Sequence, residues 1–430
     1  MYQIKLGFRS LLYRKKQYIS LFLICMFGVG ISLFCLFLSR GMLASLNEKA
    51  EIYYGGDFCV MSNHVWYQRA IRNYAKIADK MRELLPSDAV VTVRYDCDAG
   101  QNTSLFYEGE EVRQRVIKGV TFEDEKYLFS KLNFLAGDCN IEKGSNGILI
   151  SEPISKKLNA FVGDEMILYL RDLNGYINTV PVIIKGIFQD SSVFGMFTTY
   201  MDFDFIRTAF GHKKTFANRI CVEFPQRNGL TQKDLQEFQS IFEQNFEMFP
   251  LVDDKMTFYN GGGGHSKETM AIISLKSNLN DVKILKSAMT AIITLIIILL
   301  VIIIVAGIGS TYRVIVMKRI NEIGVYMAIG MKKRDIMKSL LFESLFLLLS
   351  GCLAGFIFAG LLCRIFASIK FTFIPSFSIF LTKGYLHPVI DGTGLLYLMV
   401  SVIFVTLIAV YYSVKKCVNI MPCNAISANE

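Results

Sequence analysis

The sequence contains little that could perform catalysis. Only four of its 430 residues are histidines, at positions 64, 212, 265 and 387, and none is spaced as a pair of metal ligands. His-Glu-x-x-His, Cys-x-x-Cys and Gly-x-Ser-x-Gly motifs are all missing. Residues 261–268 come closest to a phosphate-binding loop, but Ser266 stands where the second glycine is needed and Glu268 where a serine or threonine is needed. The sequence therefore predicts no catalytic residue, no metal site and no nucleotide hydrolysis by this chain.

Charged side chains are also few, at 19% of the chain against 52% apolar residues. Soluble domains carry about 25% charged residues. The apolar residues gather in four segments, 17–40, 287–312, 339–363 and 392–414. Each contains an uncharged run long enough to cross a bilayer, which takes roughly 20 residues. The sequence predicts a membrane protein with four transmembrane helices.

Basic charge is sorted along the chain in a way that predicts its orientation. Residues 41–285 hold 27 Lys and Arg against 32 Asp and Glu, whereas the rest of the chain holds 19 against 5. The basic residues cluster in 1–16, in the loop 313–338 and in the tail 415–430, beside the membrane spans. By the positive-inside rule these three segments, and with them both termini, lie in the cytoplasm of a cell (inner) membrane. Because the charge follows the spans, nucleic acid is not an expected partner, and the long first span is expected to be an uncleaved anchor.

The large segment between the first and second spans is predicted to be an extracytoplasmic α+β domain, residues 41–266. Amphipathic helices are expected at 64–85 and 231–246, the second opened by a Thr N-cap, with β-rich runs between them. Residues 364–391 form a second, shorter extracytoplasmic loop. A stalk helix, 267–286, is expected to run unbroken into the second span because apolar residues recur at heptad spacing: Ile272, Leu275, Leu279 and Val282. The alternative for this segment is a helix packed on its own domain.

Four cysteines lie in the predicted extracytoplasmic part: Cys59, Cys97, Cys139 and Cys221. Four cysteines allow three pairings. Their wide, irregular spacing fits buried small apolar residues as well as disulfides, so the sequence leaves both open.

The cytoplasmic loop 313–338 is predicted to contain a short amphipathic helix within 317–337. Its apolar stripe has helical spacing, two small residues four apart, Gly324 and Ala328, lie on the same segment, and basic clusters flank it. The apolar side would meet either lipid headgroups or a partner protein, which would approach closely at the two small residues. Gly351 and Gly355 in the next span form a G-x-x-x-G pair that permits close helix approach, and we expect it to hold the permease assembly together.

The same loop resembles a known family. Arg319, Glu322-Ile323-Gly324 and Ala328-Ile329-Gly330, followed by Glu343, Gly351 and Gly355, are similar to the R-x-x-E-I-G-x-x-x-A-I-G pattern of FtsX/MacB-type ABC transporter permeases. Short runs of the outer domain, such as 147–152, and the tail residues Pro422 and Ala425 also resemble this family, and the length of the domain favours its MacB- and LolC/LolE-like branch.

The resemblance implies a permease subunit without a fused ATPase. Its partners would be a separate ABC ATPase, which binds ATP-Mg, a second permease chain in a homo- or heterodimer, membrane lipid, and a lipoprotein or adaptor on the outer side; the chain itself would bind no cofactor. The implied ATPase-coupling residues are Arg319, Glu322, Ile323, Gly324, Ala328, Gly330, Lys332 and Lys333, and the implied helix-packing residues are Gly351 and Gly355.

In such a mechanotransmission transporter, ATP-driven closure of the ATPases would push on the loop and move the outer domains. The substrate would be extracytoplasmic or in the outer leaflet: a lipoprotein, a peptide, or an antibiotic or other lipophilic compound for export. The alternative is a non-transporting ABC signal transmitter that regulates an extracytoplasmic cell-wall hydrolase or sensor.

Overall fold

A computed structural model describes residues 15–63, 69–98, 103–114, 116–172, 174–190, 192, 194–227, 229–261, 269–279, 283–371 and 375–418. The chain divides into a helical unit, made of Met1–Met42, Ser287–Ile369 and Leu386–Glu430, and an α/β unit, made of Leu43–Lys286 and Lys370–Tyr385. The predicted turn after residue 261, the residues before 15 and the tail after 418 lie outside the described residues.

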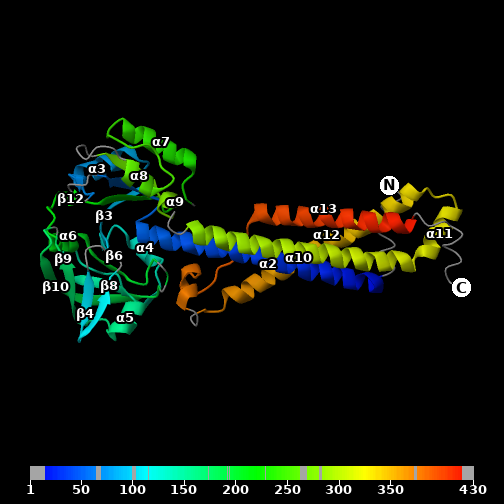
Figure 1. Cartoon of the computed structure of the whole chain (residues 1–430), viewed down its shortest axis with the longest axis horizontal. Helices are drawn as coiled ribbons and strands as arrows, with labels where there is room; N and C mark the ends of the chain where they lie inside the picture. The colour runs from blue at the N-terminus through cyan, green and yellow to red at the C-terminus, as the bar shows by residue number, and fades with distance from the viewer. Residues whose placement is uncertain are drawn as a thin grey trace. The chain divides into compact units, whose positions relative to one another are not determined.

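Long apolar helices build the helical unit (Figure 1). They are α2 (Lys15–Tyr54), α10 (Lys283–Lys318), α12 (Lys333–Ala367) and α13 (Gly392–Val418), with the short α11 (Ile320–Ala328) between α10 and α12. Four of them contain segments long and apolar enough to cross a membrane: Gln17–Tyr54, Lys286–Lys318, Lys333–Ala367 and Gly392–Lys415. The four spans predicted from the sequence are therefore confirmed as apolar helices.

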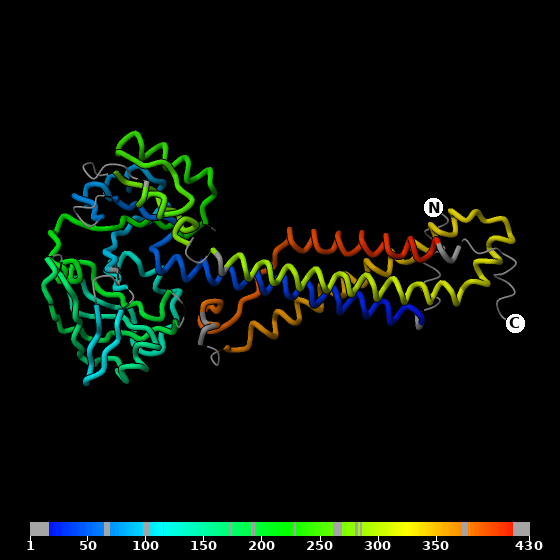
Figure 2. Tube along the Cα trace, in the orientation of Figure 1, coloured from blue at the N-terminus to red at the C-terminus, as the bar shows by residue number. Residues whose placement is uncertain are grey.

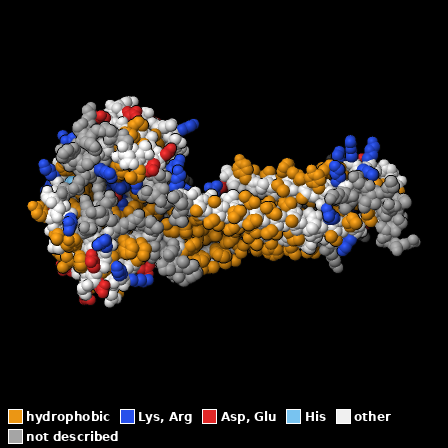
Figure 3. All heavy atoms as spheres, viewed as in Figure 1, with side chains coloured by type: hydrophobic (Ala, Val, Ile, Leu, Met, Phe, Trp, Pro, Cys, Tyr) orange, Lys and Arg blue, Asp and Glu red, His pale blue; other side chains and the backbone are white. Residues whose placement is uncertain are grey.

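The centre of the helical unit is formed by α2 and α12. In the most apolar 18-residue stretch of α2, 39% is buried, and in that of α12, 33%. The corresponding share for α10 is only 11%. On α2 the fully buried residues recur every fourth position, as Leu21, Cys25, Val29 and Leu33, which is the spacing of one helix face. Apolar side chains cover the visible surface of the unit (Figure 3), as expected of a protein whose solvent is lipid.

Helix α2 is longer than the predicted span 17–40. It continues to Tyr54 because Leu46, Ala50 and Tyr54, again four residues apart, are buried in the α/β unit against Phe194 and Leu279. The end of the uncharged apolar run therefore marks the end of the surface that lipid can cover. The helix itself extends about 20 Å beyond residue 40, at 1.5 Å per residue.

The α/β unit is built on a mixed twelve-stranded sheet in the order β14-β1-β13-β3-β6-β11-β8-β10-β9-β4-β5, with β7 also paired to β10, and a separate two-stranded sheet of β2 and β12. Two pairs, β8 with β10 and β6 with β11, are parallel. The strands are β1 (Phe58–Ser62), β2 (Ile71–Arg72), β3 (Val90–Asp98), β4 (Ser104–Tyr107), β5 (Glu110–Arg113), β6 (Val116–Val120), β7 (Phe134–Gly137), β8 (Gly147–Ser151), β9 (Glu165–Arg171), β10 (Ile177–Phe188), β11 (Thr198–Asp202), β12 (Phe216–Ala217), β13 (Arg219–Glu223) and β14 (Met270–Ser274).

Helices pack on this sheet and complete its core (Figure 2). They are α3 (Tyr74–Leu84), α4 (Lys126–Ser130), α5 (Glu152–Leu158), α6 (Phe203–Ala209), α7 (Gln232–Glu243), α8 (Lys255–Gly261) and α9 (Leu275–Asn278). The predicted Thr N-cap is confirmed: Thr231 and Asp234 form a capping box at the start of α7. The predicted helix 64–85 is too long, because residues 71–72 pair with β12 and the helix begins only at Tyr74.

The predicted stalk helix 267–286 is wrong. Met270–Ser274 forms edge strand β14, paired with β1, and α9 covers only Leu275–Asn278 before α10 begins at Lys283. Ile272 is buried in the sheet, whereas Leu275 and Leu279 pack with α2, and Val282 lies outside the described residues. The four consecutive apolar residues 270–273 fit a buried strand as well as a heptad, and the structure shows all four buried in β14.

The predicted loop 364–391 belongs to both units. Helix α12 continues to Ala367, Lys370–Tyr385 joins the α/β unit with a 3₁₀ helix, η4 (Pro375–Phe380), and residues from Leu386 return to the helical unit.

Candidate functional site

The segment between α10 and α12 consists of one short helix bounded by two defined turns. Arg319 occupies the N-cap position of α11, and its carbonyl accepts a hydrogen bond from the Ile323 N–H at 3.1 Å. At the other end, the N–H of Gly330 donates to Met327 O and that of Met331 to Tyr326 O, both at 3.0 Å, which is a Schellman motif. Gly330 has φ +94°, a conformation that glycine adopts without strain. The predicted single helix within 317–337 is therefore a nine-residue helix with its own stop signal.

A buried polar triad fixes the start of this helix to two membrane spans. The Arg319 guanidinium donates from Nη1 to both oxygens of Glu343 on α12, at 3.0 and 2.9 Å, and to the hydroxyl of Tyr18 on α2, at 2.9 Å. The Tyr18 hydroxyl in turn donates to Glu343 Oε1. All three residues are at most 6% exposed. Since a buried charge is tolerated only when it is paired, the triad holds α2, α12 and the α10–α11 corner together.

A second bond reinforces the same junction. The hydroxyl of Tyr312, near the end of α10, donates to the backbone carbonyl of Leu340 on α12 at 2.7 Å, and its side chain is 1% exposed. Any displacement of α11 therefore acts on helices that are already cross-linked by buried hydrogen bonds.

The two sides of α11 have different surroundings. Ile323 and Gly324 are buried within the helical unit. Val325 is 50% exposed and Ile329 is 78% exposed, and Gly330 is exposed as well. Ala328 is also exposed. Gly324 is covered by its own chain, and the close approach of a partner at this residue stays a prediction. The free apolar surface of α11 consists of Val325, Ala328 and Ile329.

Glu322 lies at the edge of that surface. Its carboxylate accepts a hydrogen bond from Arg319 Nε at 3.2 Å, and its side chain is 36% exposed. It thus joins the buried triad to the free surface of α11.

Basic side chains border the exposed surface of α11. Lys332 is the N-cap residue of α12, Lys333 and Arg334 lie in its first turn, and all three are exposed. Cations near a helix N-terminus oppose the helix dipole, so these residues do not stabilise the helix that they begin. Figure 3 shows Lys and Arg side chains gathered at the end of the helical unit that carries α11.

Gly351 and Gly355 form an intrachain contact. A Cβ added to Gly351 would lie 2.7 Å from both Cβ and Sγ of Cys25, and one added to Gly355 would lie 3.0 Å from Met26 O. These glycines let α12 approach α2 closely. The close helix approach that we expected at these glycines is therefore made with α2 of the same chain, and a role in holding two permease chains together stays a prediction.

The C-terminal end of α2 is held by a buried arginine that the sequence-based predictions missed. Arg94 on β3 donates from Nη1 to the carbonyls of Ile52 and Tyr53, at 2.9 and 3.0 Å, and pairs with Glu125 through Nε and Nη2. Neither side chain of the pair is exposed. A cation at the carbonyl end of a helix complements the dipole, so Arg94 anchors α2 in the sheet. The signal that could have revealed it is an arginine within an otherwise apolar strand pattern.

The described residues contain no group of three or more His, Cys, Asp or Glu that could hold a metal ion. The four cysteines of the α/β unit are free thiols in this structure, and Cys59 and Cys221 are direct cross-strand neighbours on β1 and β13. Of the three pairings that the sequence allows, only the one containing Cys59–Cys221 places two cysteines opposite each other in the sheet.

The helical unit contains the part of the chain that is similar to a known family. Residues 294–422 match the family model of the FtsX-like permease C-terminal domain. No curated protein matches the sequence. The family match and the four apolar helices support a multi-pass membrane protein of the ABC permease type. FtsX-like permeases are membrane transport components rather than enzymes, and they generally work with an ABC ATPase.

Proposed function

We propose that the chain is the permease subunit of an ATP-driven mechanotransmission transporter, and that the exposed surface of α11 docks on a separate ABC ATPase. The observation that carries the proposal is the Tyr18–Arg319–Glu343 triad, two members of which lie inside the region matched by the family. A short helix that only rested on lipid headgroups would not need a buried ionic link to two spans. A helix on which a partner protein pushes needs such a link, because the displacement must be passed on to the spans.

The exposed surface of α11 suits a protein cleft. Val325 and Ile329 offer apolar anchors, and the neighbouring lysines offer charge to an acidic rim. Anchors that fill a pocket in a partner, surrounded by polar contacts, are the usual energetic centre of an interface.

The proposed transmission path follows the helices. ATP-driven closure of the ATPases displaces α11, the triad passes the displacement to α2 and α12, and α2 is one continuous helix from Lys15 to Tyr54. Arg94 holds the final turn of α2 to the sheet of the α/β unit. The positive-inside charge pattern supports a cytoplasmic α11 and an extracytoplasmic α/β unit.

The substrate is proposed to lie on the outer side, as a lipoprotein, peptide or lipophilic compound in the outer leaflet. No charged residue lies in the middle of the four predicted spans, where a polar substrate crossing between them would often need one. A MacB- or LolC/LolE-like branch and a second permease chain are part of this proposal.

Photo-crosslinking tests the docking surface. Benzoylphenylalanine at Ile329 should capture an ABC ATPase, identified by its peptides, in native membranes. The same probe at Leu353, which is 63% exposed in the middle of the span formed by α12, is the matched control and should capture none. Equal capture at both positions, or only lipid adducts at Ile329, would refute docking by α11.

A further inference from the structure

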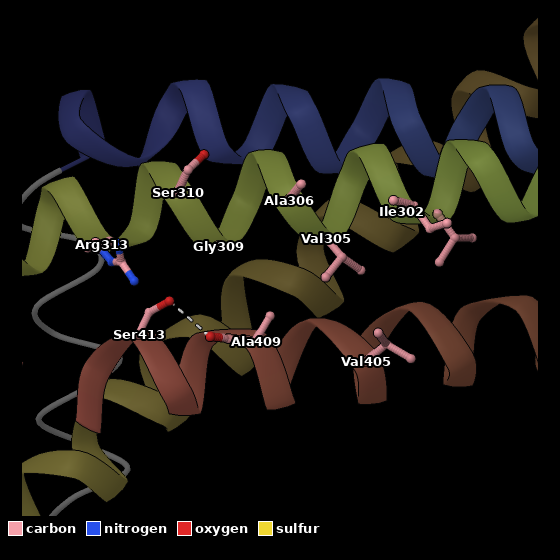
Figure 4. A pocket seen from close by; sticks show the side chains of 10 residues that line it. Ile302, Val305, Ala306, Gly309, Ser310, Arg313, Val405, Ala409 and Ser413 are labelled. Atoms are coloured by element: carbon pink, nitrogen blue, oxygen red, sulfur yellow. Dashed lines mark hydrogen bonds between the residues drawn. The ribbon is translucent and has the colours of Figure 1, made fainter. Parts of the chain in front are cut away.

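A groove in the helical unit lies between α10 and α13 (Figure 4). Its volume is about 420 Å³, within the range of ligand pockets in proteins. Small residues make the room: Ala306 and Gly309 on α10 and Ala409 on α13 line it. A Cβ added to Gly309 would only reach van der Waals contact with Ala409, at 3.7 Å. Small residues on two helices usually allow close packing, yet here the helices leave a hollow.

The two ends of the groove differ in chemistry. Figure 4 shows Ile302 and Val405 at one end and Ser310, Arg313 and Ser413 at the other. Ile302 and Arg313 are eleven residues apart on α10, so the groove is roughly 16 Å long at 1.5 Å per residue. Its polar end is the end nearer α11, since α10 and α13 both finish there with their basic residues.

Arg313 is available to a ligand. It is exposed, and no carboxylate among the described residues is paired with it. It lies five residues before the end of α10, where a long basic side chain can keep its guanidinium at the headgroup level while its stem covers apolar surface. A guanidinium binds a phosphate through two parallel hydrogen bonds. The hydroxyls of Ser310 and Ser413 donate to the carbonyls of Gly307 and Ala409, at 3.1 and 3.0 Å, so the guanidinium is the group that offers free donors.

We propose that this groove binds an anionic phospholipid, with one acyl chain in the apolar hollow and the phosphate on the guanidinium of Arg313. The groove opens on the lipid-facing surface of α10, whose apolar window is only 11% buried, so hydrocarbon chains surround it. Charge complementarity at the polar end selects a phosphate-bearing lipid. By the positive-inside rule this lipid belongs to the cytoplasmic leaflet, where anionic headgroups are attracted to basic residues near the spans. The site is independent of the transported substrate.

Native mass spectrometry of the full chain, released from detergent with added phosphatidylglycerol, tests the site. Arg313→Gln should weaken phosphatidylglycerol binding about five-fold, the effect of one basic residue near a membrane surface. Ala409→Phe should abolish the tightest binding by filling the groove. Arg313→Lys should retain most of it. Arg364→Gln, an exposed arginine in the last turn of α12, is the matched control and should bind as the parent does.

Each contrary result is distinguishable. Unchanged binding in both Arg313→Gln and Ala409→Phe, with folding verified by an unchanged melting temperature, would overturn the proposal. So would displacement of the lipid by excess inorganic phosphate, which would mark a site for a free anion. If Ala409→Cys cross-links two copies of the chain in membranes without loss of phosphatidylglycerol binding, the groove is occupied by a second copy and not by lipid.

Discussion

Arg319 and Glu343 form an ion pair inside the helical unit, with Nη1 and Oε2 2.9 Å apart and side chains 7% and 2% exposed. In the sequence Arg319 belongs to the motif of the predicted cytoplasmic loop, and Glu343 lies in a predicted span. In the structure the two side chains form one buried contact between α11 and α12, to which the hydroxyl of Tyr18 on α2 also belongs. We call this contact the joint.

The first prediction concerns the strength of this joint. Removal of one partner leaves a buried charge alone, so Arg319→Met or Glu343→Leu should each destabilise the purified chain by about 3–5 kcal/mol. The double variant replaces the pair by apolar side chains of similar volume and should recover most of the loss. Thermal unfolding of the four proteins in one detergent measures the coupling. Additive losses in the double variant would show that the two groups do not act as a pair.

The second prediction concerns the glycines of α12. Gly351→Ala places a Cβ 2.7 Å from Cys25 and should destabilise the chain by about 1–3 kcal/mol through overpacking. Gly360→Ala, on the same helix with no atom within 4 Å of the added Cβ, is the control and should be neutral or slightly stabilising. If Gly351→Ala changes only the recovery of dimers and leaves thermal stability unchanged, the contact with α2 is not the reason for this glycine.

The four spans were predictable from the sequence because uncharged apolar runs of this length rarely occur outside membranes. The Thr231 cap was predictable because its signal is local. The prediction failed at Met270–Ser274, where the apolar positions fit a heptad and a buried strand equally well and only pairing with β1 decides between them.

The candidate site was predictable in identity but not in geometry. The motif marked Arg319, Glu322 and Gly330, yet the structure gives them different roles. Arg319 is buried and anchors α11, Glu322 is its half-exposed partner, and Gly330 forms the turn after the helix. Tyr18 and Arg94 carried no motif, and their partners lie on other helices and strands, so no local pattern could reveal them. The burial of Gly324 could not be predicted, because the stripe of apolar residues does not say which face of α11 is covered by the chain itself.

The third prediction concerns the pH dependence of the α/β unit. Burial raises the pKa of Glu223 to about 7 and that of Asp57 to about 6. An unfolded chain loses these protons at lower pH than the folded one. Between about pH 4.5 and 7 the folded state therefore holds more protons, and the contribution of these carboxyls to stability falls as the pH rises, then stays constant above about pH 7.

Thermal unfolding of the parent and of Glu223→Gln across this range measures the effect. The Glu223→Gln variant should gain stability relative to the parent as the pH rises from about 5 to about 8. A constant difference between the two proteins over that range would contradict the assignment of a raised pKa to Glu223.

The fourth prediction concerns orientation. Tyr176→Cys and Ile329→Cys create thiols at positions of nearly equal exposure, 72% and 78%, so their reactivities can be compared directly. In intact cells a membrane-impermeant maleimide should label Tyr176→Cys, and it should label Ile329→Cys only after permeabilisation. Labelling of Ile329→Cys in intact cells would reverse the topology derived from the basic charge.

Coupling through α11 is tested most directly by the rate of ATP hydrolysis of the full chain purified with its ATPase and reconstituted in liposomes. Ile329→Asp puts a charge at the C-cap of α11, on the most exposed large apolar residue of its surface, and Ile329→Met keeps the surface apolar. We predict that Ile329→Asp reduces hydrolysis to the basal rate of the isolated ATPase while Ile329→Met keeps the stimulated rate. Stimulated hydrolysis in the Ile329→Asp complex would contradict the proposal that α11 couples the permease to its ATPase.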